Sequence, residues 1–343
     1  MAITPRILLN DDGPPGPESP YSFGLYRHLT RDLGLDVKVV VPSSQKSWIG
    51  KAYHITEITK GRYYYPREPD GLGDTSPVSR PLKDGEVAEW ILLDGTPATC
   101  SNIALHNLYP GQIDLLISGP NFGRNTSAAF SLSSGTIGAA LSSSLSQIRS
   151  IAVSYGNVER PTPTTYFEPA HILAARIIRY LWDNWGKDLG GTRNGEVDLY
   201  NVNIPMIGQL LREEGMQVQW TNMWRNSYGR LFKAVPVVEA PFTEKEVPAE
   251  GPDSAPTGTV EQRDSGRNPS SEGVGDLAFK FSPDIQSLIT PDLSTVPVGS
   301  DGWAIGKGFA SVTALRACFA EATTFAEGAH VGDIEEGMRI IKL

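Results

Sequence analysis

Short apolar runs alternate with helix-like segments over the first two thirds of the chain. The run at 6–9 (RILL) stops at the turn residues 10–13 (NDDG), the pattern of a buried strand that ends in a loop. Ser19 and Pro20 suit a helix start, and apolar residues then recur at helical spacing up to Gly34. A β-branched run at 36–41 follows, so we predict two parallel strands joined by a right-handed crossover.

The same alternation continues and predicts an α/β fold. We expect further strands at 90–93, 114–117, 150–154 and 197–202, and helices at 97–108, from about 136, and at 167–185. Their sum is a Rossmann-like, doubly wound, mostly parallel sheet with helices on both faces, which is a three-layer α/β/α arrangement.

The C-terminal part of the chain has a different pattern. Residues 244–276 are rich in Glu, Pro, Ser and Gly and hold few apolar residues, so they bury too little surface to offset the entropy of ordering. We predict a flexible insertion there. Residues 303–315 alternate like one strand, and 317–325 predict a helix. We therefore divide the chain into a Rossmann-like core at 1–205 and a C-terminal elaboration at 206–343.

Charge and composition narrow the partners. The formal charge of −9 argues against binding to a nucleic-acid duplex, which needs clustered Lys and Arg. A small phosphate ester remains compatible with this charge, because backbone amides or a metal ion can supply positive charge at the site. Cys100 and Cys318 are expected to be buried core thiols. The sequence contains no signal peptide and no apolar run of about 20 residues, so we expect a cytoplasmic protein without a membrane span.

Two adjacent carboxylates, Asp11 and Asp12, directly follow the first predicted strand. Open parallel sheets bind ligands at the carboxyl ends of their strands, and carboxylates this close repel unless a cation joins them. Hard oxygen donors suit Mg²⁺, Mn²⁺ or Ca²⁺ better than zinc. The alternative is an ordinary polar turn in which both side chains cap backbone amides, and by itself this motif does not decide between the two.

Three further polar loops, at 43–47, 119–125 and 133–136, follow strand ends or precede a helix. In a parallel sheet they converge on one edge, where backbone amides and hydroxyl groups can bind phosphate. Each loop taken singly is more often a plain connection or a helix cap. Their joint placement favours a phosphate site.

These segments occur in an order that resembles the SurE (survival protein E) phosphatase family. The similar segments are 7–13 (ILLNDDG), 41–47 (VPSSQKS), 94–97 (DGTP), 118–125 (SGPNFGRN), 134–140 (SGTIGAA), 201–205 (NVNIP) and, more loosely, 308–313 (GFASVT). The two prolines after the aspartates and the long insertion are more similar to eukaryotic, fungal-like members. The chain departs from the family pattern at Leu9, at 46–48 (KSW) and at Pro120.

The resemblance implies one divalent ion, Mg²⁺ or Mn²⁺ and in a crystal also Ca²⁺. Its implied ligands are Asp11, Asp12, Ser47 and Asn121. The implied catalytic residues are Asp11, Asp12 and Asn10, and the implied phosphate-binding residues are Asn125, Ser134, Gly135 and Thr136. The family also implies homodimers or homotetramers, held partly by C-terminal β-hairpin and helix elements.

The resemblance implies a phosphomonoesterase, a 5'/3'-nucleotidase or a phosphatase of broader range, acting on nucleotides or similar small esters. An alternative is a nucleotide-binding regulatory or scaffold protein of the same fold without turnover. A haloacid-dehalogenase-like phosphatase would need Asp-x-Asp where this chain has Asp-Asp-Gly, and the absence of Gly-x-Gly-x-x-Gly after the first strand argues against a dinucleotide dehydrogenase.

Overall fold

The structure is a computed structural model that describes residues 5–10, 13–159, 161–234 and 278–320. The predicted insertion at 244–276 and both aspartates at 11–12 lie outside these residues, as does the end of the helix predicted at 317–325. Among the described residues, no helix combines the length and the apolar character needed to cross a membrane.

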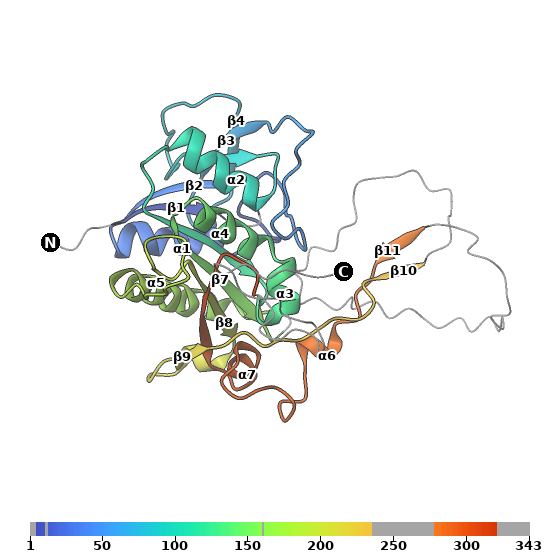
Figure 1. Ribbon diagram of the computed structural model, residues 1–343. Helices are drawn as coiled ribbons and strands as arrows, with labels where there is room; N and C mark the ends of the chain where they lie inside the picture. Colours follow the sequence, from blue (N-terminus) through green and yellow to red (C-terminus); the bar gives the residue numbers. More distant parts are fainter. Residues whose placement is uncertain (1–4, 11–12, 160, 235–277, 321–343) are drawn as a thin grey trace, which may run out of the picture.

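A ten-stranded sheet forms the centre of the described structure (Figure 1). Its strands lie in the order β4-β3-β5-β2-β1-β6-β7-β8-β12-β9. The strands from β5 to β8 are parallel, β3 pairs antiparallel with β5 and β4, and β12 pairs antiparallel with β8 and parallel with β9. The strand bounds are β1 Arg6–Asn10, β2 Asp36–Pro42, β3 Gly61–Pro66, β4 Gly73–Ser76, β5 Trp90–Leu93, β6 Leu115–Phe122, β7 Arg149–Asn157, β8 Leu199–Met206, β9 Val218–Thr221 and β12 Ala310–Leu315.

Two apolar cores cover the two faces of this sheet, because successive strand residues point to opposite sides. Ile7 and Leu9 of β1 belong to the larger core, together with residues of α1 (Ser22–Arg27) and α5 (Phe167–Asp183). Leu8 belongs to the second core, together with residues of α2 (Pro97–Ile103) and α4 (Gly135–Leu145). The predicted three-layer, Rossmann-like fold is confirmed.

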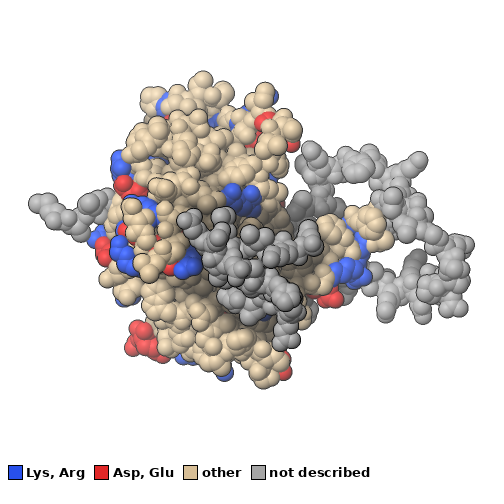
Figure 2. All heavy atoms as spheres, in the orientation of Figure 1, with Lys and Arg blue, Asp and Glu red and all other residues tan. Residues whose placement is uncertain are grey.

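Shorter elements complete the described chain. They are η1 (His28–Asp32), η2 (Ala104–Leu108), α3 (Ser127–Ser133), η3 (Thr164–Tyr166), η4 (Gly208–Leu211), β10 (Phe232–Ala234), β11 (Phe279–Phe281), α6 (Gln286–Ile289) and α7 (Asp301–Gly306). The strands β10 and β11 form a separate antiparallel pair, which stands away from the main sheet in Figure 1. Figure 2 shows acidic and basic side chains interspersed on the face in view.

Three local predictions were wrong. The first helix begins at Ser22 rather than next to Ser19, since Ser19 instead forms a backbone bridge with Gly16. Residues 303–315 are not one strand: the Ser300 hydroxyl caps α7 by accepting a hydrogen bond from the amide of Trp303, and only Ala310–Leu315 forms a strand. Cys318 is exposed, whereas Cys100 is buried as expected.

Candidate active site

The site lies where the order of the strands reverses. β1 has β2 on one side and β6 on the other, and Asn10 at its end pairs with Ser118 of β6. A crevice outside the carboxyl ends of the strands at such a switch point is the usual ligand site of open α/β sheets. The loops after β1 and β2 also pack together, because a Cβ added to Gly13 would lie 3.4 Å from the backbone nitrogen of Gln45.

One pocket opens at this edge, and it gathers five of the predicted site residues. It is lined by Ser47, Trp48, Asn121, Asn125, Phe130, Ser133, Ser134 and Gly135. Asn10 and Thr136 are buried and do not line it. Asp11 and Asp12 lie outside the described residues, so their roles stay predictions.

Asn121 reaches the pocket through an irregularity in β6. The pairing register between β6 and β7 shifts between Ser118 and Asn121. Gly119 in this stretch has φ +114°, and a Cβ there would lie 2.1 Å from the carbonyl oxygen of Val153, so only glycine fits. The side-chain amide of Asn121 donates to the Gly123 carbonyl at 2.8 Å, which leaves Oδ1 as the atom available to a ligand.

Asn125 is held by a network of amides. Its backbone nitrogen donates to Oδ1 of Asn203 at 2.7 Å, and its side-chain nitrogen donates to the Ser154 hydroxyl at 2.8 Å. The side chain of Asn201 donates to the Asn125 carbonyl at 2.8 Å. The sequence motif at 201–205 included both β8 asparagines but gave them no role; the structure shows that they fix Asn125.

Ser134 and Gly135 begin helix α4. The Ser134 hydroxyl accepts a hydrogen bond from the amide of Ile137 at 3.2 Å, so this serine is the helix cap that the sequence also allowed. A Cβ on Gly135 would lie 3.0 Å from Cγ2 of Ile49 and 3.2 Å from the Lys46 carbonyl oxygen, and glycine therefore permits the loop after β2 to approach closely. The amides of a helix N-terminus attract anions such as phosphate.

The described donors fit a hard divalent cation. The buried Oγ of Ser47 has no hydrogen-bond partner among the described residues, nor has Oδ1 of Asn10, whose side-chain nitrogen donates to the Pro97 carbonyl. Hydroxyl and amide oxygens are ligands that Mg²⁺, Mn²⁺ and Ca²⁺ accept. Within the same described ranges, no cluster of three His, Cys, Asp or Glu side chains is arranged to hold a metal.

A buried carboxylate, Asp301, anchors the loop that follows Asn125. Its oxygens accept hydrogen bonds from the amides of Ser127 at 2.7 Å, Trp224 at 2.9 Å and Gly302 at 2.7 Å. Burial raises the pKa of Asp301, and these three donors oppose the shift. Ser127 has φ +71°, so this contact holds an unfavourable backbone conformation in place. Sequence reasoning missed Asp301, because 174 residues separate it from Ser127.

Comparison with known proteins identifies the family. The family model described as "Survival protein SurE" matches residues 7–230, which include every residue assigned to the site. The chain belongs to the SurE family. This confirms the resemblance seen in the ordered motifs.

Curated relatives of this SurE-family chain carry two kinds of name. A "5'-nucleotidase SurE" from Pelobacter propionicus is 34% identical over 140 residues, which are 40% of this chain and 52% of that protein. A "Probable tubulin--tyrosine ligase PBY1" from Saccharomyces cerevisiae is 33% identical over 264 residues, which are 70% of this chain but only 34% of that protein. The chain thus spans about half the length of the Pelobacter relative and about a third of the length of the yeast relative.

A solved structure supports the SurE fold over nearly the whole chain. The SurE protein from Aquifex aeolicus matches 92% of this chain and 95% of its own, with a TM-score of 0.55. The sequence identity is 22%, so this likeness bears on the fold alone.

Proposed function

We propose that this SurE-family protein is a divalent-metal-dependent phosphomonoesterase that hydrolyses nucleoside monophosphates or related phosphomonoesters. One observation carries the proposal: Ser47, Asn121, Asn125, Ser134 and Gly135, from separate loops, line one pocket at the switch point of the sheet. The nucleotidase names of several relatives agree with this chemistry.

In this proposal Asp11, Asp12, Ser47 and Asn121 hold Mg²⁺ or Mn²⁺. The ion, when bound, supplies positive charge that phosphoryl transfer requires. One of the two aspartates orients the attacking water, with Asn10 beside them. The Asn125 side chain and the start of α4, at Ser134, Gly135 and Thr136, bind phosphate oxygens, since helix amides stabilise negative charge without a basic side chain.

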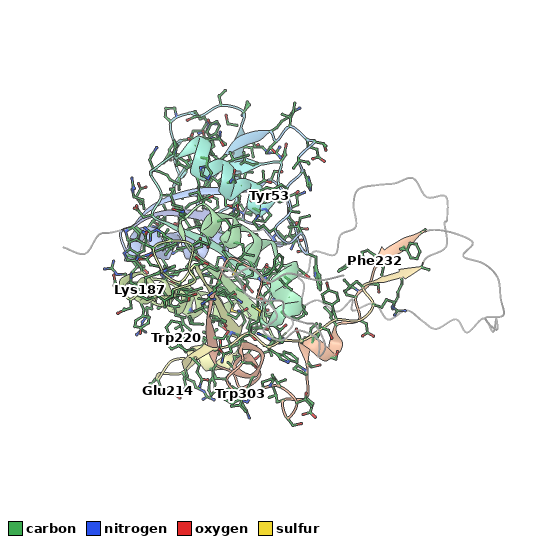
Figure 3. The ribbon with its side chains drawn as sticks, viewed as in Figure 1. Tyr53, Lys187, Glu214, Trp220, Phe232 and Trp303 are labelled. Atoms are coloured by element: carbon green, nitrogen blue, oxygen red, sulfur yellow. The ribbon has the colours of Figure 1, made fainter. Side chains whose placement is uncertain are left out.

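We also propose that the protein assembles as a homodimer or homotetramer in the cytoplasm through its C-terminal elements. Large apolar side chains are exposed there: Trp220 is 58% exposed and Phe232 on β10 is 53% exposed (Figure 3). Phe279 on β11 is 57% exposed. Apolar surface of this kind favours a protein interface. Light scattering of the full chain at several concentrations measures the assembly, and a monomer throughout would refute it.

A phosphate-release assay tests the activity. The full chain is stripped with a chelator and assayed on a panel of nucleoside monophosphates, without metal and after adding Mg²⁺ or Mn²⁺. We expect release only with metal. Asp11→Asn should lose turnover by roughly 10³-fold and stay folded, because a positioned metal ligand contributes several kcal/mol to the transition state. The control, Asp74→Asn, alters an exposed carboxylate on β4 and should keep full turnover.

The alternative function predicts another result. If the wild-type chain binds nucleotides but releases no phosphate under any metal condition, it is a binding protein that has kept the fold without turnover. Normal hydrolysis by folded Asp11→Asn would instead remove that residue from the metal site.

A further inference from the structure

An aromatic side chain forms part of the pocket wall next to Ser47. Trp48 and Phe130 both line the pocket, and their ring centroids are 6.0 Å apart at an interplanar angle of 70°. Phe130 belongs to α3 and is only 2% exposed, so it is a fixed support for Trp48.

Two more rings support Trp48 from the C-terminal part of the chain. Its ring lies 6.3 Å from that of Tyr228 and 5.3 Å from that of Phe281 on β11, at angles of 68° and 63°. All three neighbours therefore meet Trp48 at steep angles. Among the described residues, no ring stacks parallel on it, so a planar group in the pocket would supply the parallel partner.

The backbone of Trp48 shows that this ring is held in place at a conformational cost. Trp48 has φ +58°, a left-handed conformation that favours glycine over bulky residues. Such conformations persist where the surroundings over-determine them, and they cluster at ligand sites. Packing on Phe130 is one such constraint.

The pocket wall is also uncharged. Its eight lining residues are Ser, Trp, Asn, Phe and Gly, with no Lys, Arg, Asp or Glu among them. An ester whose leaving group carries an extra charge would find no opposite charge on this described wall, whereas a flat apolar ring would find an aromatic partner.

We propose that Trp48, supported by Phe130, is the specificity-determining residue of the pocket and favours phosphomonoesters whose leaving group contains a planar aromatic ring. This inference rests on the proposed phosphomonoesterase function and adds the residue that selects the leaving group. If the inference is right, a phosphate ester with an aromatic ring in its leaving group is a better substrate than an aliphatic phosphate ester, whether or not the leaving group contains a sugar.

The test compares phenyl phosphate with glycerol phosphate. The full-length chain is assayed with Mn²⁺ or Mg²⁺ as wild type, as Trp48→Gly, which suits the left-handed backbone, and as Trp48→Tyr, which restores a ring. Stacking on an aromatic side chain changes binding by roughly five- to a hundredfold. We expect the ratio of kcat/KM between the two esters to fall about tenfold in Trp48→Gly, mainly through KM, and to recover in Trp48→Tyr.

An unchanged ratio would overturn the inference, whether both activities stay the same or both fall equally; an equal fall indicates that Trp48 only holds the fold. Calorimetric binding of both esters to the same three proteins separates this inference from the proposed function. If the wild type releases no phosphate but binds phenyl phosphate more tightly than Trp48→Gly does, while the two proteins bind glycerol phosphate equally, the activity is refuted and the selectivity stands. Equal binding by both proteins refutes the selectivity.

Discussion

Several buried polar atoms near the pocket lack hydrogen-bond partners among the described residues, whereas two buried carboxylates at the C-terminal side of the sheet have them. At the pocket edge, Oγ of Ser47, Oδ1 of Asn10 and Oγ1 of Thr136 have no hydrogen-bond partner among the described residues. On the C-terminal side, Asp301 accepts three backbone hydrogen bonds. Asp198 likewise accepts bonds from Thr192 and from the amide of Ala317.

This difference separates residues kept for a ligand from residues kept for the fold. A buried polar atom without a partner costs free energy, so such an atom in the lining of a pocket indicates a bound group that satisfies it. Ser143 and Ser311 also have hydroxyls without partners in the described structure, and neither lines the pocket. Among the described residues, Ser47 is the one that combines a missing hydrogen-bond partner with a place in the pocket lining, and it is therefore the informative case.

Removing Asp301 should have the largest effect on stability. Asp301→Ala leaves one buried and two partly buried amide donors without an acceptor, which should cost about 4 kcal/mol of unfolding free energy. Urea denaturation measures the loss. Asp292→Ala is the matched control, because Asp292 is exposed and caps only the local turn at Ser294, so its effect should be much smaller. Similar stabilities for the two variants would show that Asp301 does not anchor the pocket loop.

The central part of the fold was predictable, because local patterns define it. The strand at 90–93 was predicted with the bounds that the structure shows, and the helix predicted at 167–185 is Phe167–Asp183. The pair β3 and β4 was missed. β3 (GRYYYP) holds three consecutive tyrosines without an apolar–polar alternation, and β4 (GDTS) is polar and forms the edge of the sheet. An edge strand buries little surface and so leaves a weak apolar pattern.

The site was predictable only as a set of loops. The motifs identified Ser47, Asn121 and Asn125 because each follows a strand that the apolar pattern reveals. Their supports were not predictable, since Asp301 and Asn203 contact the site across 174 and 78 residues of chain. No local pattern encodes such a contact; it follows from how β8, α7 and the pocket loops pack.

A buried histidine, His171, should make the unfolding free energy depend on pH, with an effect smaller than that of removing Asp301. His171 is 3% exposed, its Nδ1 lies 3.1 Å from the Tyr155 hydroxyl, and burial followed by the charge of His28 lowers its pKa to about 3. The unfolded chain binds this proton below about pH 6.5 and the folded chain does not, so stability is complete above pH 6.5 and is lost as pH falls towards 3. The loss is up to about 1.4 kcal/mol per pH unit.

The histidine contribution is measured as a difference between two proteins. His171→Gln removes the titrating group, so its unfolding free energy should fall less between pH 6 and pH 4 than that of the wild type, by about 2 to 3 kcal/mol. Equal slopes would show that the pKa of His171 is the same in the folded and the unfolded chain, and would refute the shift that burial is expected to cause.

The smallest change in stability is expected at the pocket itself, where two serines can be compared. Ser47→Ala removes a hydroxyl that has no partner among the described residues, so the unfolding free energy should change by less than about 0.5 kcal/mol, while phosphate release falls at least tenfold through loss of a proposed ligand. Ser144→Ala is the opposite case. Its hydroxyl donates to the carbonyl oxygens of Ala140 at 2.9 Å and Asp198 at 3.0 Å, so this variant should lose about 1 kcal/mol and keep its turnover. If both variants lose stability equally and both keep turnover, a missing partner does not mark a ligand site in this protein.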